Sequence, residues 1–236
     1  TALPKPSVYR AHGGDRARLM RLSFLGHACF LAESADGLRV LMDPYRPGAL
    51  GGRISHAAIS EPADLVVVTH YHEDHGWVSC APGATVVDGP GTFAGLEFRT
   101  VWLPHDGCHG SQMGYTRMMA FTMDGVSVLH PGDLGRAPTD DDLAQLGDIH
   151  LLLLPVGGRF TLPIAEAVSL QARLLPRWTV PMHYRSAKVD LDMAPLEDYL
   201  AAIDGAPLTV SSCSVLDCDS AQLTGAPEIV LLPPAM

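Results

Sequence analysis

The chain has no apolar run long enough to cross a membrane, which takes about 18 to 20 consecutive apolar residues. We therefore expect no transmembrane helix. Its first residues, TALPKPSVYRAHGGDRARLM, also lack the apolar centre of a secretion signal. Because the chain begins at Thr1 and not at a methionine, the removal of a leader before Thr1 stays open.

Positive charge is scarce, with 16 basic against 26 acidic residues and a formal net charge of -10. This surplus of acid disfavours binding to the phosphate backbone of nucleic acids or to an anionic membrane. The five cysteines are scattered and form no CxxC pair, which argues against a zinc ribbon or a thioredoxin-type site. We expect reduced thiols in a cytoplasmic protein, although Cys213 and Cys218 are near enough in sequence to pair.

The composition is that of a globular protein, with 47% hydrophobic and 18% charged residues over 236 positions. A chain of this length can bury a substantial core in one domain. Residues 1–18 contain Pro4, Pro6 and a Gly13-Gly14 pair, so we expect an extended arm there. The remaining residues, 19–236, are expected to form a single domain.

Hydrophobic patterning predicts strands throughout the first half and alternating strands and helices in the second. Strands are expected within 19–34, 38–44, 63–70, 84–90, 96–105, 115–125, 126–133, 149–158 and 177–184, and two or three more in the last thirty residues. Helices are expected within 139–148, 163–176 and 196–205. Asp124-Gly125 is typical of a hairpin turn. The glycine-rich segment 45–55 is expected to be a loop.

The stretch VTHYHEDHG, which follows a β-branched apolar run, crowds three histidines and two carboxylates into six residues. His70 and His72 are two residues apart, so in an extended chain they point to the same side. Asp74 and His75 follow where a helix could begin. Neutral imidazole and carboxylate together suit zinc, iron or manganese. The stretch therefore predicts metal ligands at the end of a buried strand. The alternative interpretation, a polar turn with solvated histidines, explains this pattern less well.

Three later strand ends carry the same kinds of ligand. His105 ends the run TVWLPH, Asp133 lies in HPGDLG and His183 lies in VPMHY. Any one of them alone is more typical of a core, surface or turn residue. Their occurrence in this order after the histidine-rich turn predicts that they join it at one edge of a sheet.

The order HxHxDH, His, Asp, His resembles the metallo-β-lactamase superfamily. The motifs LGHACF, LMDP, THYHEDHG, HPGDLG, LLLPVGG and PMHY resemble most closely the branch of predicted metal-dependent hydrolases that includes ascorbate-6-phosphate lactonase-like proteins. The resemblance extends from about residue 19 to about residue 232. It implies an α/β fold of the αββα type, in which two mixed sheets lie face to face with helices outside and the metals at one edge.

The resemblance also implies two divalent cations, with zinc preferred and manganese or iron as alternatives. It assigns His70, His72 and His105 to the first metal. It assigns Asp74, His75 and His183 to the second, and Asp133 to both. Two cations lower the pKa of a water between them, so a bridging hydroxide could attack a lactone, ester, amide or phosphodiester. Asp74 would also orient this nucleophile.

Other residues are candidates for supporting roles. Asp43 matches a carboxylate that ties down the metal-binding loop in this superfamily. His27 matches a histidine typical of the branch and is expected to face the site as a catalytic or substrate-contacting residue, with a purely structural role as the alternative. His109 flanks a ligand without a counterpart in the branch, and His130 precedes the Gly-Asp turn.

Substrate contacts are harder to predict. Arg159 and Arg185 could bind an anionic substrate group, with Arg46 and Arg53 as rivals. For each of these arginines the sequence favours a solvated surface charge over a substrate contact. The segment QMGYT at 112–116 replaces the RGxN pattern expected from the branch, so we expect substrate selection to differ there while the ligand set is unchanged.

Three functional hypotheses remain open from the sequence. The first is a hydrolase with a dinuclear metal centre acting on a small molecule. The second is a non-hydrolytic iron oxygenase or redox enzyme on the same fold. The third is a binding or regulatory protein that has lost catalysis, which the complete set of ligands disfavours. The low charge and the proline-rich arm are compatible with a homo-oligomer.

Overall fold

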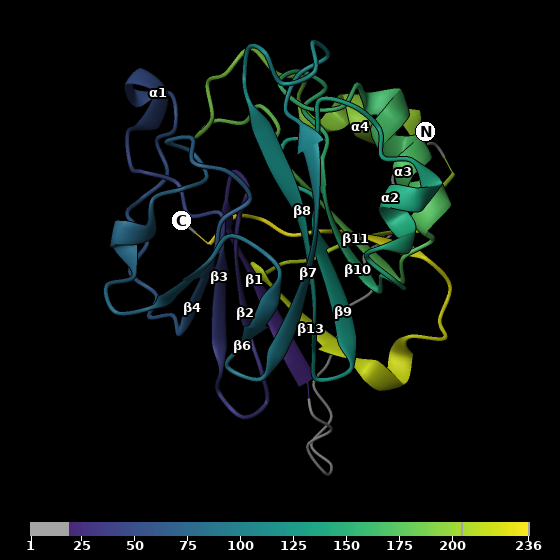
Figure 1. Ribbon diagram of the computed structural model, residues 1–236. Helices are drawn as coiled ribbons and strands as arrows, with labels where there is room; N and C mark the ends of the chain where they lie inside the picture. Colours follow the sequence, from purple (N-terminus) through teal and green to yellow (C-terminus); the bar gives the residue numbers. More distant parts are fainter. Residues whose placement is uncertain (1–18, 204, 236) are drawn as a thin grey trace.

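Two sheets form the framework of the protein in the computed structural model, which describes residues 19–203 and 205–235 (Figure 1). The arm expected over residues 1–18 lies outside the described residues. The first sheet contains β1 (Leu19–Gly26), β2 (Cys29–Glu33), β3 (Arg39–Met42), β4 (Leu65–Val67), β5 (Thr85–Val87) and β13 (Val215–Asp219), in the order β13-β1-β2-β3-β4-β5. This sheet is mixed, because β3, β4 and β5 are parallel whereas β1, β2 and β13 pair antiparallel.

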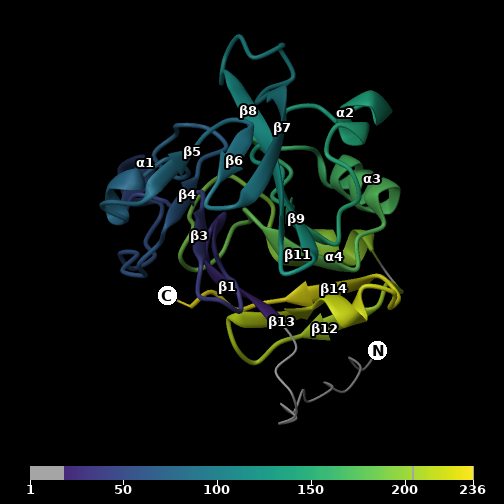
Figure 2. The same ribbon diagram turned by 60° about the horizontal axis from the view of Figure 1, so that its bottom comes forward.

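The second sheet is larger and also mixed. It contains β6 (Gly91–Phe93), β7 (Leu96–Pro104), β8 (Tyr115–Met123), β9 (Val126–His130), β10 (Leu151–Pro155), β11 (Trp178–Met182), β12 (Leu208–Val210) and β14 (Glu228–Leu231). Their order is β12-β14-β11-β10-β9-β8-β7-β6. The expected hairpin at Asp124-Gly125 joins β8 to β9, and both residues have positive φ (50° and 82°), as the favoured two-residue turn requires. The connection between β7 and β8 extends beyond the sheets (Figure 2).

Helices cover the outer face of the eight-stranded sheet. They are α2 (Asp140–Ala144), α3 (Ile164–Leu174) and α4 (Leu196–Ala202), and each lies where the sequence predicted a helix (Figure 1). Thr139 caps α2. Its side chain accepts a hydrogen bond from the backbone N–H of Asp142, and the Asp142 side chain accepts one from the backbone N–H of Thr139. Within 19–203 and 205–235, no helix is long and apolar enough to cross a membrane.

The outer face of the six-stranded sheet is covered mainly by loops, where the resemblance led us to expect helices on both sides. Within the part of the chain that the structure describes, only the short turns α1 (Ala49–Gly52) and η1 (Val78–Cys80) lie there. Within α1, Leu50 and Gly51 have left-handed backbone angles, because the glycine-rich sequence does not sustain a helix. Ile54, Ile59 and Leu191 nevertheless bury this face of the sheet.

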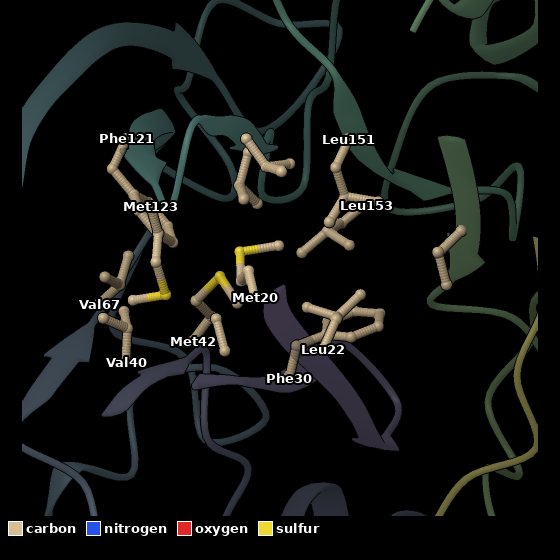
Figure 3. Packing of buried hydrophobic residues seen from close by; sticks show 14 of the residues in the cluster. Met20, Leu22, Phe30, Val40, Met42, Val67, Phe121, Met123, Leu151 and Leu153 are labelled. Atoms are coloured by element: carbon tan, nitrogen blue, oxygen red, sulfur yellow. The ribbon is translucent and has the colours of Figure 1, made fainter. Parts of the chain in front are cut away.

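The main core lies between the two sheets (Figure 3). Met20, Leu22 and Phe30 from one sheet pack with residues such as Leu151 and Leu153 from the other. The intervening leucines of β10 point to the helices instead, which explains the unbroken run LLLL. Each fully buried side chain of this kind contributes about 1.5–3 kcal/mol. This packing fixes the strand ends that carry the polar residues described next.

Strand directions place several C-terminal ends at one edge. In the large sheet, β9, β10 and β11 are parallel, and β7 runs the same way because both β7 and β9 are antiparallel to β8. In the small sheet, β3 and β4 are parallel, and β1 shares their direction through β2. Residues that follow β1, β3, β4, β7, β9 and β11 can therefore meet, as ligands gathered from distant parts of the sequence must.

Candidate metal centre

Six strand ends each deliver one polar residue to the centre. These residues are His27 after β1, Asp43 after β3, His70 after β4, His105 after β7, Asp133 after β9 and His183 after β11. All six are buried. Buried polar side chains need partners, since an unpaired one costs about 1–3 kcal/mol. Burying these six polar side chains is therefore unfavourable unless they, or a ligand among them, provide one another with partners.

Three of these residues sit in backbone conformations that side chains disfavour. The φ angle is 55° at His27, 43° at Asp43 and 52° at His183. Each left-handed non-glycine residue of this kind costs on the order of 1–3 kcal/mol. All three directly follow a strand, so the sharp turn returns the side chain to the end of the sheet. Such strain concentrates at functional sites because the surrounding structure holds it in place.

Two glycines allow the segments of the centre to approach closely. At Gly132, which has a φ of 61°, an added Cβ would collide with the hydroxyl of Thr116 and meet Thr69 at 2.8 Å. At Gly135 it would collide with the backbone of Asp106. The glycines on either side of Asp133 therefore pack the turn after β9 against the segments that carry the other ligands.

The donor atoms form three groups, within each of which all atoms lie within 4.8 Å of one another; one of them, Asp43 with His70 and His75, overlaps the two that matter most here. The first group is His70, His72 and His105, and the second is His27, Asp74, His75 and His183. Asp133 lies between them. Its Oδ2 is 3.5 Å from His105 Nε2 on one side, and 3.1 and 3.2 Å from the Nε2 atoms of His75 and His183 on the other. All seven ligands implied by the resemblance are thus brought together.

Several donor atoms of this cluster have no hydrogen-bond partner among the described residues. They include Nε2 of His70, His75 and His105, and Oδ1 of Asp133, all buried. The 3.1 Å contact from His75 to Asp133 lacks the directionality of a hydrogen bond. Imidazole nitrogen and carboxylate oxygen are the ligands that zinc, manganese and iron prefer. The residues present therefore fit divalent metal.

The electrostatics of the cluster favour positive charge. Burial alone would lower the pKa of His75, but the carboxylates of Asp133 and Asp74 outweigh it and raise this pKa well above its usual value. Burial likewise would raise the pKa of Asp133, yet His183 and His75 hold it well below its usual range. The carboxylates are therefore ionised at neutral pH, and a cation among them is strongly attracted.

Asp43 and Thr69 support the histidines from behind. Asp43 Oδ1 accepts the Thr69 backbone N–H at 2.8 Å, and its Oδ2 accepts the Thr69 hydroxyl at 2.5 Å and lies 2.8 Å from His75 Nδ1. Thr69 Oγ1 is in turn 3.0 Å from His70 Nδ1. Because these contacts engage Nδ1 of His70 and His75, the Nε2 atoms of both rings face the cluster. Metal-binding histidines are commonly held in this way, with the second ring nitrogen hydrogen-bonded to a supporting residue. Thr69 was not predicted, although it directly precedes His70.

Arg117 is a second contributor that sequence reasoning missed. Its backbone N–H and its Nη1 both donate to the carbonyl oxygen of Thr69, each at 3.0 Å. Its guanidinium lies 3.9 Å from the centre of the Trp102 ring. The available signal was a single charge within the apolar strand sequence YTRMMAF. Arg117 thus connects the large sheet to the residue that precedes the first histidine.

His27 faces the second group of donors. Its Nε2 is 3.1 Å from Asp74 Oδ2, and its carbonyl oxygen accepts the backbone N–H of His183 at 2.9 Å. Burial lowers the pKa of His27 to about 4, and the neighbouring His183 acts in the same direction. The ring is therefore neutral at neutral pH.

His130 contacts backbone behind the centre. Its Nε2 lies 2.9 Å from the carbonyl oxygen of Ala28, and its Nδ1 accepts the backbone N–H of Gly132 at 3.2 Å. His130 is completely buried, and its Nε2 lies 3.8 Å from Asp43 Oδ2, the oxygen that also contacts His75. Its contacts hold the turn that presents Asp133.

Three predicted residues lie at the surface, away from the donor groups. His109 is exposed in the connection between β7 and β8. Arg159 and Arg185 are also exposed and line one open depression of about 460 Å³, where Arg159 pairs with Asp192 at 3.0 Å. The same depression includes Gly157, where an added Cβ would collide with the carbonyl oxygen of His183. The two arginines are therefore neighbours of the centre and not part of it.

The comparisons with known proteins agree with this geometry. The β-lactamase superfamily domain matches residues 21–183. A UPF0173 metal-dependent hydrolase of Carboxydothermus hydrogenoformans is 30% identical over 200 residues, covering 71% of this chain and 85% of the relative. Both the fold and the metal-binding cluster define a metallo-β-lactamase-type protein. The chain belongs to the β-lactamase superfamily and, within it, to the metal-dependent hydrolases.

Solved structures show the same fold. One assigned to the zinc-dependent hydrolases of the metallo-β-lactamase superfamily, from Thermotoga maritima, has a TM-score of 0.69 and 25% identity, over 90% of this chain and 98% of that one. CmlA, a diiron β-hydroxylase from Streptomyces venezuelae, has a TM-score of 0.56 and 16% identity, over 94% of this chain and 54% of that one. The second likeness concerns the fold alone.

Proposed function

We propose that the protein hydrolyses a small molecule at a dinuclear metal centre. The observation that carries this proposal is the pair of donor groups with Asp133 Oδ2 between them. His70, His72 and His105 would hold one cation, and Asp74, His75 and His183 would hold the other. Zinc is the preferred ion, because imidazole dominates both groups, and manganese or iron is the alternative.

When bound, the two cations would supply an acidified water as nucleophile and would stabilise negative charge on the substrate. The chain itself contributes orientation and the exclusion of bulk water. Asp74 is buried, with its carboxylate directed toward the donor groups, so it can orient an attacking water as well as bind metal. Burial would raise the pKa of Asp74, but His75 and His27 outweigh it, and the carboxylate stays ionised.

The substrate that this chemistry suits is a lactone, ester, amide or phosphodiester. Arg159 and Arg185 lie in a depression that adjoins the backbone of His183, so they are the candidates for binding an anionic group of the substrate. Arg185 is the stronger of the two, because Arg159 already pairs with Asp192. His109 is the candidate for contact with a substrate from the connection between β7 and β8.

We also propose a cytoplasmic location. All five cysteines are free, including Cys213 and Cys218, which the sequence left as a possible pair. Cys108 is exposed and Cys29 is buried, so cysteines are unpaired both at the surface and in the core. Unpaired thiols of this kind are typical of a reducing compartment.

Metal content and a small substrate panel test the proposed function together. Purified protein would be analysed for metals and assayed with a generic phosphodiester, an aryl ester and a lactone. About two zinc or manganese ions per chain, with turnover of one class, would support the dinuclear hydrolase. One iron per chain, without hydrolysis but with oxygen uptake, would contradict it and favour the iron oxygenase instead.

A further inference from the structure

His27 occupies a place in the second donor group that the seven expected ligands do not explain. Its donor atom lies within 4.8 Å of those of Asp74, His75 and His183, as close as these are to one another. Its ring is 4.4 Å from the ring of His183 and 5.4 Å from that of His75, centre to centre. Three imidazoles therefore surround one region of space.

Three of the distances between donor atoms match those of a shared coordination shell, whereas His75 Nε2 and Asp74 Oδ2 are farther apart, at 3.7 Å. With bonds of about 2.1 Å, two ligands of one metal lie about 3.0 Å apart at a right angle and about 3.4 Å apart at a tetrahedral angle. His27 Nε2 is 3.1 Å from Asp74 Oδ2. On the opposite side, Nε2 atoms of His75 and His183 are 3.1 and 3.2 Å from Asp133 Oδ2.

The backbone also holds the His27 ring in this place. His27 directly follows β1 with a φ of 55°, and its carbonyl oxygen accepts the N–H of His183, which is itself in the second group. Its Nδ1 is buried and has no hydrogen-bond partner among the described residues. The only polar contact of the ring is therefore the one that Nε2 makes within the donor group.

We propose that His27 is a direct ligand of the second metal. This site then has five protein donors, namely His27, Asp74, His75, His183 and the shared Asp133. The first site has four, namely His70, His72, His105 and Asp133. The two sites are therefore unequal. At this second site the five-donor set of nitrogen and oxygen suits a cation that accepts five or six ligands, such as manganese or ferrous iron, so zinc stays the preferred ion only at the four-donor first site.

The inference rests on the proposed function only in requiring that two cations bind. Counting the coordinated imidazoles tests it directly. The protein would be stripped of metal and loaded with two equivalents of cobalt(II), which shifts the imidazole N–H proton of each bound histidine far outside the normal proton NMR range. We expect six such exchangeable resonances in the unaltered protein, from His27, His70, His72, His75, His105 and His183.

Variants assign the resonances. His27→Ala should remove one resonance, leaving five, and should weaken retention of one cobalt. His109→Ala is the matched control, because His109 is exposed and outside both groups, and should leave six. Five resonances in the unaltered protein with two cobalt ions retained would overturn the role of His27 and leave the dinuclear centre standing, even if His27→Ala failed to fold. Failure to retain cobalt would overturn the proposed function itself.

Discussion

Asp43 Oδ2 and His75 Nδ1 lie 2.8 Å apart, and both side chains are completely buried. His75 Nδ1 donates its hydrogen bond to the Asp43 carboxylate, and this turns Nε2 toward Asp133. Because the same carboxylate binds Thr69, it fixes both the first and the last part of the histidine-rich turn. The geometry of the centre therefore depends on one residue outside the seven expected ligands.

Replacing Asp43 with asparagine tests this dependence. An amide nitrogen in place of Oδ2 cannot accept the His75 proton, so we expect a 10–100-fold loss of metal affinity, the usual effect of removing such a supporting contact. Competition with a coloured chelator would measure it. Asp190→Asn, at an exposed aspartate, is the control and should bind metal normally. Equal affinity in both variants would show that Asp43 does not support the centre.

Asp133 is the residue on which the dinuclear proposal depends most, because its Oδ2 faces both donor groups. Asp133→Ala should lose at least one metal equivalent and all turnover, whereas its circular dichroism should stay close to that of the unaltered protein. Elemental analysis and the substrate panel would measure these effects. Full activity in this variant would contradict a mechanism that uses two metals.

The sequence predicted most of the individual strands and helices through signals that are local. The capping residue Thr139, the hairpin Asp124-Gly125 and the apolar run of β10 each determine their element from neighbouring residues alone. The two-sheet arrangement came from the resemblance. The short edge strand β6 was not predicted, since Gly91–Phe93 is only three residues long and its pairing with β7 depends on tertiary contacts.

The donor residues were predictable because each follows an apolar strand and belongs to an unusual combination of residue types. Their supporting contacts were not. Arg117 reaches Thr69 across 48 positions, and Asp43 reaches His75 across 32. No local pattern encodes such a pair. The close approach of His27 to Asp74 is of the same kind, with 47 positions between them.

Arg117 should contribute to stability through the Thr69 carbonyl. Arg117→Met keeps an apolar side chain beneath Trp102 but removes the charged donor, so we expect a loss of about 1.5–3 kcal/mol in the free energy of unfolding, the range for hydrogen bonds to charged groups. Urea denaturation would measure it. Arg21→Met is the control, because Arg21 and its partner Asp217 are both more than half exposed, and should change stability by less than about 1 kcal/mol. Similar effects of both substitutions would argue against a special role for Arg117.

Asp106 organises the connection between β7 and β8 directly after His105. Its carboxylate accepts the backbone N–H groups of Cys108, Gly110, Gln112 and Met113 at 2.7–2.9 Å. These four hydrogen bonds lower the pKa of Asp106 to about 2, and the one from the backbone of Met113 has the largest effect. One ionised side chain thus shapes the segment next to a predicted ligand.

The pH dependence of this segment follows from the lowered pKa of Asp106. Because the folded-state pKa lies below that of the unfolded chain (about 3.9), the stabilisation is present above the unfolded value and is lost as pH falls through about 2. Amide hydrogen exchange at Gly110, Gln112 and Met113 should therefore stay slow at pH 5. In Asp106→Asn, one oxygen acceptor is replaced by a donor, so exchange at these amides should be faster at pH 5 while that of the β8 core is unchanged. Equal protection in the two proteins would mean that the loop holds its shape without this carboxylate.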